Sequence, residues 1–250
     1  MNEQDKKKTK KIVILAIMGV FAGLLLYSGA NLIQYFKDEQ ENKIIQEVIE
    51  KSIEINDENE TPDKKYIIDF ENLKAQNPDT VAYLKVYGTT IDYVVVRADD
   101  NYYYLKHNFN RTWSIPGWVF VDYRNALDGN DKNIIIYGHN MSDGTMLGSL
   151  NQTLTREWQD IPENREIVFV TEKGVTIYEV FSTYEILPES FYITTTFKND
   201  EEYQNFLNTL YYRSNYNYGV PVNKDDEILT LSTCVGNGEK RVVLHAKKQK

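Results

Sequence analysis

The sequence predicts a mainly β fold: a closed barrel or sandwich of about eight short strands with flanking helices, joined to an N-terminal transmembrane helix. From Tyr66 onward, segments rich in β-branched and aromatic residues recur, with turn sequences between them. The chain has 250 residues and is 42% hydrophobic, which suffices for one domain with a substantial core. An uncharged apolar run at residues 12–36 is long enough to span a membrane.

The N-terminal segment has the pattern of a signal anchor. Residues 1–11 contain five lysines and precede the apolar run at 12–36, which exceeds the about 20 residues that a transmembrane helix needs. A cleaved signal peptide is the alternative, with small residues at 28–30, but its apolar core would be shorter. Lysines before the run and acidic residues after it indicate a cytoplasmic basic tail at 1–11, with the rest of the chain outside the cell.

The remaining chain divides into a spacer and a domain. Residues 37–65 combine apolar residues at helical spacing with the polar stretch NDENETPDKK, which predicts a helical stalk and linker. Residues 66–250 form the predicted extracellular domain. In this range the elements follow one another closely, and we find no low-complexity segment.

The elements of the domain can be predicted in order. IIDFENLKAQNPD is typical of a short helix that ends at a turn, VAYLKVYG and IDYVVVRA of paired strands, and DNYYYLKHNF of a helix. GWVFVDYR, NIIIYGHN, EIVFVTEKG and VTIYEVFSTYEI predict further strands. NDEEYQNFLNTLYYRS has helical spacing, and EILTLSTC and RVVLHAK predict a final hairpin around VGNGEK.

Composition argues against several classes of function. The formal net charge of −9 argues against a nucleic-acid partner, because phosphate binding needs a basic surface. A single cysteine cannot form an intramolecular disulfide. One cysteine and three scattered histidines do not make a zinc site, so we predict neither a metal nor a cofactor.

The only cysteine, Cys234, ends a predicted strand just before the turn sequence VGNGEK. A thiol becomes a nucleophile as the thiolate, which a neighbouring histidine can produce. His139 is the best candidate, because it ends the strand NIIIYGH and so occupies the same kind of position. His107 lies in a predicted aromatic helix, where a structural role is expected, and His245 lies within a strand, where it should either pack or face solvent. The alternative for Cys234 is a small buried apolar side chain.

Arg241 opens the strand that follows the turn and should lie close to the thiol if the hairpin closes. A guanidinium can donate two hydrogen bonds to the oxyanion that forms at an attacked carbonyl. The alternative, a strand-edge arginine in water, remains equally open at this point. Lys240 is a rival cation, but its point charge lacks the planar fork of an arginine.

These residues resemble a known family. TLSTC with a downstream arginine, an upstream YGH and an N-terminal anchor resembles the sortases, cysteine transpeptidases of Gram-positive cell surfaces. YGHN before MSDGTMLGSL, DNYYYLKHNF before GWVFVDYRN, and the helical insert before the last hairpin resemble class B in particular. The resemblance covers residues 66–250 and implies a closed sortase-type β-barrel. It implies Cys234 as nucleophile, His139 as acid/base and Arg241 as donor to the oxyanion.

The resemblance also implies a substrate groove. Its residues would be Asn101, Leu105, Tyr137, Tyr192, Ile193 and Ser232. The turn VGNGEK is shorter than the acidic loop of some class B members, so contacts made by that loop are in doubt. Leu105, Tyr192 and Ile193 have the alternative of serving only as core or surface apolar residues.

The implied activity is cleavage of a C-terminal sorting signal, of NPxT or SPxT type, on surface proteins. A Cys234 thioester would then pass the acyl group to an amine of a peptidoglycan precursor or a pilin. The domain would be held at the cell membrane by the single N-terminal span. Two alternatives stay open: a membrane-anchored cysteine peptidase that hydrolyses its substrate, and a non-catalytic surface-binding β-barrel.

Overall fold

The computed structural model describes residues 3–56, 61–235 and 239–249. It divides into two compact units, Met1–Glu41 and Asn42–Lys250. Helix α1 (Glu3–Glu50) begins in the first unit and ends in the second. An 18-residue window of α1 has a mean hydropathy of 2.3, so length and composition allow this helix to cross a membrane.

Part of the predicted linker is packed onto the second unit. Ile45 and Ile49, in the last turns of α1, are buried in the main hydrophobic core. Beyond α1, the short strands β1 (Ile53–Ile55) and β2 (Tyr66–Ile68) pair with each other antiparallel, and α2 (Pro62–Lys65) leads into β2. Residues on both sides of the undescribed stretch 57–60 therefore belong to the packed domain.

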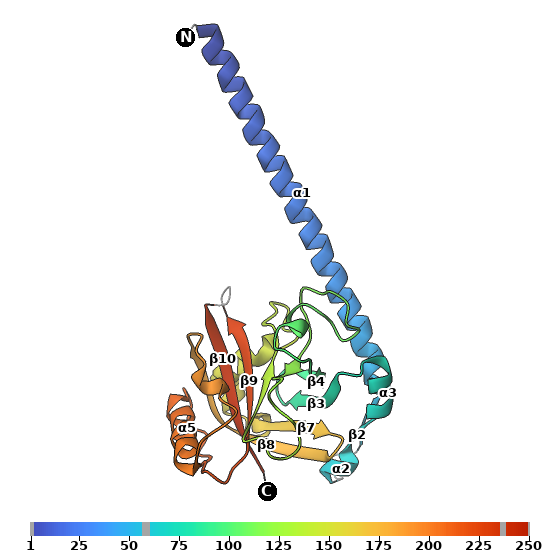
Figure 1. The fold of residues 1–250 in the computed structure, drawn as a ribbon, viewed down its shortest axis with the longest axis vertical. Coiled ribbons are helices and arrows are strands. Elements are labelled where there is room, and N and C mark those ends of the chain that lie inside the picture. The colour runs from blue at the N-terminus through green and yellow to red at the C-terminus, as the bar shows by residue number, and fades with distance from the viewer. Residues whose placement is uncertain (1–2, 57–60, 236–238, 250) are drawn as a thin grey trace. The chain divides into compact units, whose positions relative to one another are not determined.

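The second unit is built around a closed eight-stranded barrel, which confirms the predicted fold class (Figure 1). Around the barrel the order is β10-β8-β7-β3-β4-β5-β6-β9. The strands are β3 (Thr80–Val86), β4 (Asp92–Val96), β5 (Phe120–Val121), β6 (Asn133–Tyr137), β7 (Glu166–Thr171), β8 (Gly174–Ile186), β9 (Ile228–Val235) and β10 (Lys240–Lys248). Neighbouring strands are antiparallel except for two parallel pairs, β4 with β5 and β6 with β9.

Apolar side chains from all sides of the barrel form its core. Fully buried examples from five strands are Leu84, Val94, Ile136, Leu231 and Val243. Burying an aliphatic side chain of this size stabilises the fold by about 1.5–3 kcal/mol. The barrel is therefore a packed support, and a binding site has to lie at its rim or outside.

Short helices and 3-10 turns decorate the barrel. They are α3 (Phe70–Gln76), η1 (Tyr103–Leu105), η2 (Gly148–Leu154), α4 (Arg156–Gln159), η3 (Pro162–Arg165), η4 (Phe191–Ile193) and α5 (Asp200–Arg213). The side chain of Asn199 caps α5 by accepting from Glu202 N at 2.9 Å. Ser182 Oγ of β8 donates to Leu210 O at 2.7 Å, which ties α5 to the barrel.

Two predicted elements are much shorter in the structure than the sequence predicts. The helix predicted over DNYYYLKHNF is reduced to η1 (Tyr103–Leu105), because a bridge between His107 and Trp113 folds the chain back on itself. The strand predicted over GWVFVDYR is reduced to β5 (Phe120–Val121), because a turn begins at Asp122. In both places tertiary packing overrides local propensity. The resulting irregular segment forms one side of the site described next.

Candidate active site

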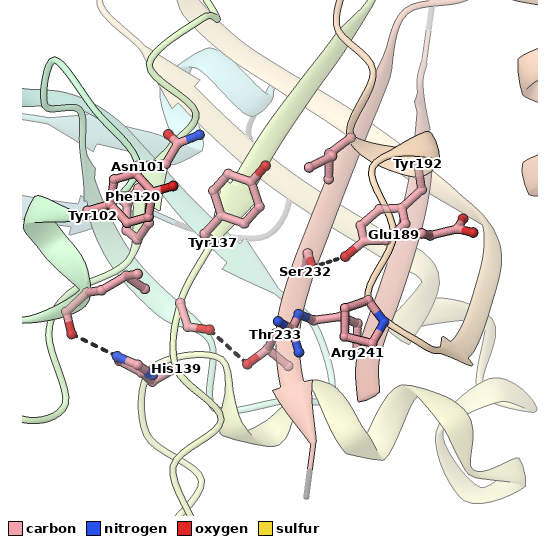
Figure 2. Close-up of a pocket in the computed structure, with 14 residues that line it drawn as sticks. Asn101, Tyr102, Phe120, Tyr137, His139, Glu189, Tyr192, Ser232, Thr233 and Arg241 are labelled. Carbon is pink, nitrogen blue, oxygen red and sulfur yellow. Dashed lines mark hydrogen bonds between the residues drawn. The ribbon is translucent and has the colours of Figure 1, made fainter. Parts of the chain in front are cut away.

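One cavity of about 340 Å³ gathers the predicted site residues at the ends of β6 and β9 and the start of β10 (Figure 2). Eight of them line it: Asn101, Leu105, Tyr137, His139, Tyr192, Ile193, Ser232 and Arg241. The ninth, Cys234, belongs to β9 by its backbone, but its side chain lies outside the described residues. Further lining residues, which sequence reasoning did not single out, are Tyr102, Phe120, Gly138, Pro188, Glu189 and Thr233.

Strand pairing explains why these distant residues converge. The parallel pairing of β6 with β9 places Tyr137 opposite Ser232, and His139 follows two residues beyond Tyr137. The antiparallel pairing of β9 with β10 places Arg241 opposite Cys234. The positions predicted for the acid/base, the nucleophile and the oxyanion donor therefore meet at one rim of the barrel.

The imidazole of His139 is held from one side. Its Nε2 lies 2.8 Å from the backbone oxygen of Leu105. Because a carbonyl oxygen can only accept, Nε2 carries the hydrogen in this contact. A neutral ring with this tautomer has its lone pair on Nδ1, the nitrogen that can then take a proton.

The carbonyl that holds His139 depends on a glycine. Gly117 has a φ of +59°, and an added Cβ there would come within 2.3 Å of Tyr104 O and 2.9 Å of Leu105 O. The next residue, Trp118, donates its backbone N–H to Tyr104 O at 2.9 Å. A side chain at position 117 would therefore push away the backbone that orients His139.

Arg241 and Lys240 occupy different environments. Arg241 is half-buried and lines the cavity, and its Nη1 donates to Lys240 O at 3.0 Å. Lys240 is exposed and forms an ion pair with Glu185 outside the cavity lining. Of these two cations, only the arginine has access to a substrate in this cavity.

Side-chain hydrogen bonds tie β9 to the rest of the wall. Tyr192 Oη and Ser232 Oγ lie 3.1 Å apart, and Thr233 Oγ1 donates to Gly138 O at 2.8 Å (Figure 2). The second bond connects the strand that carries Cys234 to the residue immediately before His139. These contacts link β9 to η4 and to the segment that leads to His139.

The other two histidines contact neighbouring side chains away from the cavity, and of the two alternatives left open for His245 the structure shows packing. His107 stacks on Tyr103 with ring centroids 4.0 Å apart. His245 is fully buried, with Tyr184 Oη at 2.9 Å and Thr230 Oγ1 at 2.8 Å. Burial lowers the pKa of His245 to about 3. Neither ring lines the cavity.

Asp122 is a charged residue behind the cavity that sequence reasoning missed. Its carboxylate is fully buried, pairs with Arg124, and accepts hydrogen bonds from Asn101 and Tyr137. The sequence signal that could have indicated it is an acidic and a basic residue, Asp122 and Arg124, two positions apart at the end of the apolar segment GWVFVDYR. Among the described residues, no group of three or more His, Cys, Asp or Glu side chains could hold a metal ion.

Comparisons with known proteins identify the family of this chain. Residues 84–249 match the family model described as "Sortase domain". The sortase B of Listeria monocytogenes is 33% identical over 228 residues, which cover 90% of this chain and 89% of that protein.

Solved structures are similar as well. A sortase B from Bacillus anthracis superposes with a TM-score of 0.74 at 33% identity, covering 86% of this chain and 99% of that one. A sortase B solved in complex with triglycine superposes with a TM-score of 0.70 at 32% identity, covering 86% and 96%. The chain thus belongs to the sortase family, is of the sortase B type, and is a cysteine transpeptidase.

Proposed function

We propose that this sortase cleaves a C-terminal sorting signal of NPxT or SPxT type and transfers the acyl group to a cell-wall or protein amine. The observation that carries the proposal is the cavity. An imidazole, a guanidinium and six candidate substrate contacts from separate segments line one hollow, beside the strand position of Cys234. A largely apolar lining with a few convergent polar groups is typical of a binding site.

In the first half-reaction the thiol of Cys234 gives its proton to His139, and the resulting thiolate attacks the carbonyl carbon of the motif threonine. The carbonyl oxygen becomes an oxyanion, which Arg241 stabilises by hydrogen bonding, a contribution of about 10²- to 10³-fold per donor. The C–N bond then breaks, and His139 gives a proton to the leaving amine, a contribution of about 10²- to 10⁴-fold. The product is a thioester on Cys234.

The half-buried ring of His139 suits proton transfer. Because the Leu105 carbonyl holds Nε2–H, we assign the proton transfer to Nδ1. In the second half-reaction an acceptor amine attacks the thioester, and Nδ1 takes the amine proton as the C–N bond forms. The thiolate leaves and the cycle closes.

The acceptor in this proposal is a primary amine on a peptidoglycan precursor or a pilin. The similar sortase B that was solved with triglycine supports a peptide amine as acceptor. Helix α1 supports the membrane as the location, with residues 12–36 as the span and residues 1–11 in the cytoplasm. Anchoring the enzyme beside substrates tethered to the same bilayer raises their effective concentration.

The test uses the full chain purified in detergent. It is incubated with fluorogenic peptides that carry NPxT, SPxT or a scrambled motif, with and without triglycine, and products are identified by mass spectrometry. We expect cleavage after the motif threonine and, with triglycine, a product in which the acyl fragment is joined to the glycine peptide. Cleavage with water as the only acceptor would favour the hydrolytic peptidase instead.

The matched control is Cys234→Ala. This variant should form no covalent acyl-enzyme and should release no fluorophore, because the thioester requires the sulfur. Persistent cleavage by Cys234→Ala would overturn the assignment of the nucleophile.

A further inference from the structure

The buried carboxylate of Asp122 lies where β5 ends and is surrounded by donors. Its side chain is 0% exposed. It accepts from Arg124 Nε at 2.8 Å and Nη2 at 2.6 Å, from Asn101 Nδ2 at 2.9 Å and from Tyr137 Oη at 2.9 Å. A buried charge is costly unless it is paired and hydrogen-bonded, and this one satisfies both conditions.

The carboxylate determines how two cavity residues are oriented. Burial by itself raises the pKa of Asp122, but hydrogen bonds from Arg124 and Tyr137 outweigh it, so this pKa lies below its usual range. The ionised group only accepts, so Tyr137 Oη and Asn101 Nδ2 must both donate to it. Asn101 Oδ1 in turn accepts from Tyr123 N at 3.1 Å, which leaves the amide a single orientation.

Arg124 extends this network to the opposite wall of the cavity. Its Nη2 also donates to the backbone oxygen of Ile193 at 3.0 Å. Ile193 ends η4, the turn that carries Tyr192. Figure 2 draws Asn101 and Tyr137 on one side of the cavity and Tyr192 on the other. One guanidinium therefore connects two walls that come from distant parts of the sequence.

We propose that Asp122 and Arg124 are positioning residues that set the distance between the two walls of the peptide-binding cavity. This inference rests on the proposed function, since it assigns the walls to the sorting peptide. Neither residue lines the cavity, so both act through Asn101, Tyr137 and Ile193. Loss of the connection should weaken peptide binding and leave the thiol chemistry intact.

The first test is Arg124→Lys in the full-length chain. Lysine keeps the positive charge. Its single ammonium group cannot form the bidentate contact with the Asp122 carboxylate and at the same time donate to the Ile193 carbonyl. The side chain is 36% exposed, so the barrel should tolerate this change. We expect KM for a fluorogenic sorting peptide to rise about 10-fold while kcat changes less than about 2-fold. The rate of Cys234 alkylation by iodoacetamide should also stay within about 2-fold of the wild-type rate, because alkylation does not require peptide binding.

Asp122→Asn is the second variant and should raise KM further, because an amide cannot accept from all three partners. Its melting temperature is measured together with the kinetics, since a loss of folding would lower kcat and the alkylation rate as well.

Asp131→Asn is the matched control: Asp131 accepts from Asn125 Nδ2, Ala126 N and Leu127 N, and lies outside the cavity lining. We expect this control to leave KM unchanged.

The outcomes separate the inference from the function on which it rests. KM within about 2-fold of wild type in both Arg124→Lys and Asp122→Asn would overturn the positioning role while the sortase activity stands. A parallel fall of kcat, alkylation rate and melting temperature in Arg124→Lys would also overturn it, because that pattern indicates general destabilisation. A wild-type chain that cleaves none of the peptides would overturn the proposed function itself, and this inference with it.

Discussion

His139 and His245 lie in the same domain but in opposite environments. His245, on β10, is fully buried, and both of its ring nitrogens are hydrogen-bonded, to Tyr184 and Thr230. His139 lies beyond the end of β6, half-buried in the cavity wall, with Nε2 held by the Leu105 carbonyl. The enclosed ring, hydrogen-bonded at both nitrogens, stabilises the fold, whereas the ring held from one side is accessible from the cavity.

The interior histidine is nevertheless connected to the site. Thr230 Oγ1 donates to Asn133 Oδ1 at 2.7 Å, so its oxygen accepts from Nδ1–H of His245. Asn133 Nδ2 in turn donates to the backbone oxygens of Tyr192 at 3.3 Å and Thr194 at 3.0 Å. The interior network thus supports the segment that forms one wall of the cavity. We therefore predict that the two histidines differ in what they do for the reaction, and substitutions can test this prediction.

The largest expected effect separates the two rings directly. His139→Ala should lower kcat/KM by at least about 10³-fold, because acid/base catalysis is lost in both half-reactions, with little change in melting temperature. His245→Gln should do the reverse: it should destabilise the fold by about 1–3 kcal/mol and change kcat by less than about 5-fold at low temperature. Peptide cleavage assays and thermal melts of both variants are the measurement. Equal activity losses in the two variants would contradict the distinction.

An intermediate effect tests whether the backbone orients His139. Gly117→Ala should lower kcat/KM by about 10²-fold, because the added Cβ displaces the Leu105 carbonyl and the imidazole with it. Gly219→Ala is the matched control, since Gly219 also has a positive φ, +70°, but nothing lies within 4 Å of its added Cβ. Both variants carry the strain of a positive φ, and only Gly117→Ala adds a clash with the backbone, so Gly117→Ala should also lose more stability. If Gly219→Ala lost as much activity as Gly117→Ala, backbone strain rather than the carbonyl would be responsible.

The strands of the barrel were predictable because enrichment in β-branched and aromatic residues is a local property of the sequence. The segments around Ile136 and Val168 are continuous runs of apolar, mostly β-branched residues, the segment around Leu231 alternates, and each forms a strand. The parallel pairing of β6 with β9 is not local, so only the resemblance to sortases indicated that His139 and Arg241 would meet. The predicted helix at residues 100–109 failed for the opposite reason, because contacts with residues farther along the chain override its propensity.

The site was predictable where chemistry depends on side-chain type. A single cysteine, a histidine at a strand end and an arginine at a strand start can be recognised in the sequence. The Leu105 carbonyl could not be predicted, because every residue carries a backbone oxygen and only the fold determines which one faces an imidazole. Asp122 was not predicted as a site residue. Its contact with Tyr137 depends on a turn that begins at this position, whereas the sequence pattern predicts that the strand continues there.

The smallest expected effect is the pH dependence of stability that His245 confers. Burial lowers its pKa to about 3, with a further contribution from the charge of Arg213, against an ordinary value of 6.5 in the unfolded chain. As pH falls below 6.5, the unfolded chain binds a proton at His245 that the folded chain does not bind. The contribution of His245 to the free energy of unfolding is therefore full above pH 6.5 and decreases toward pH 3. Between pH 7 and pH 5 the loss amounts to about 2 kcal/mol.

Urea unfolding of wild type and His245→Gln at both pH values isolates this contribution, because the carboxylates common to both proteins cancel in the difference. If the wild type and His245→Gln lost the same stability over this interval, the interior ring would have to be protonated in the folded protein, and the contrast between the two histidines would fail.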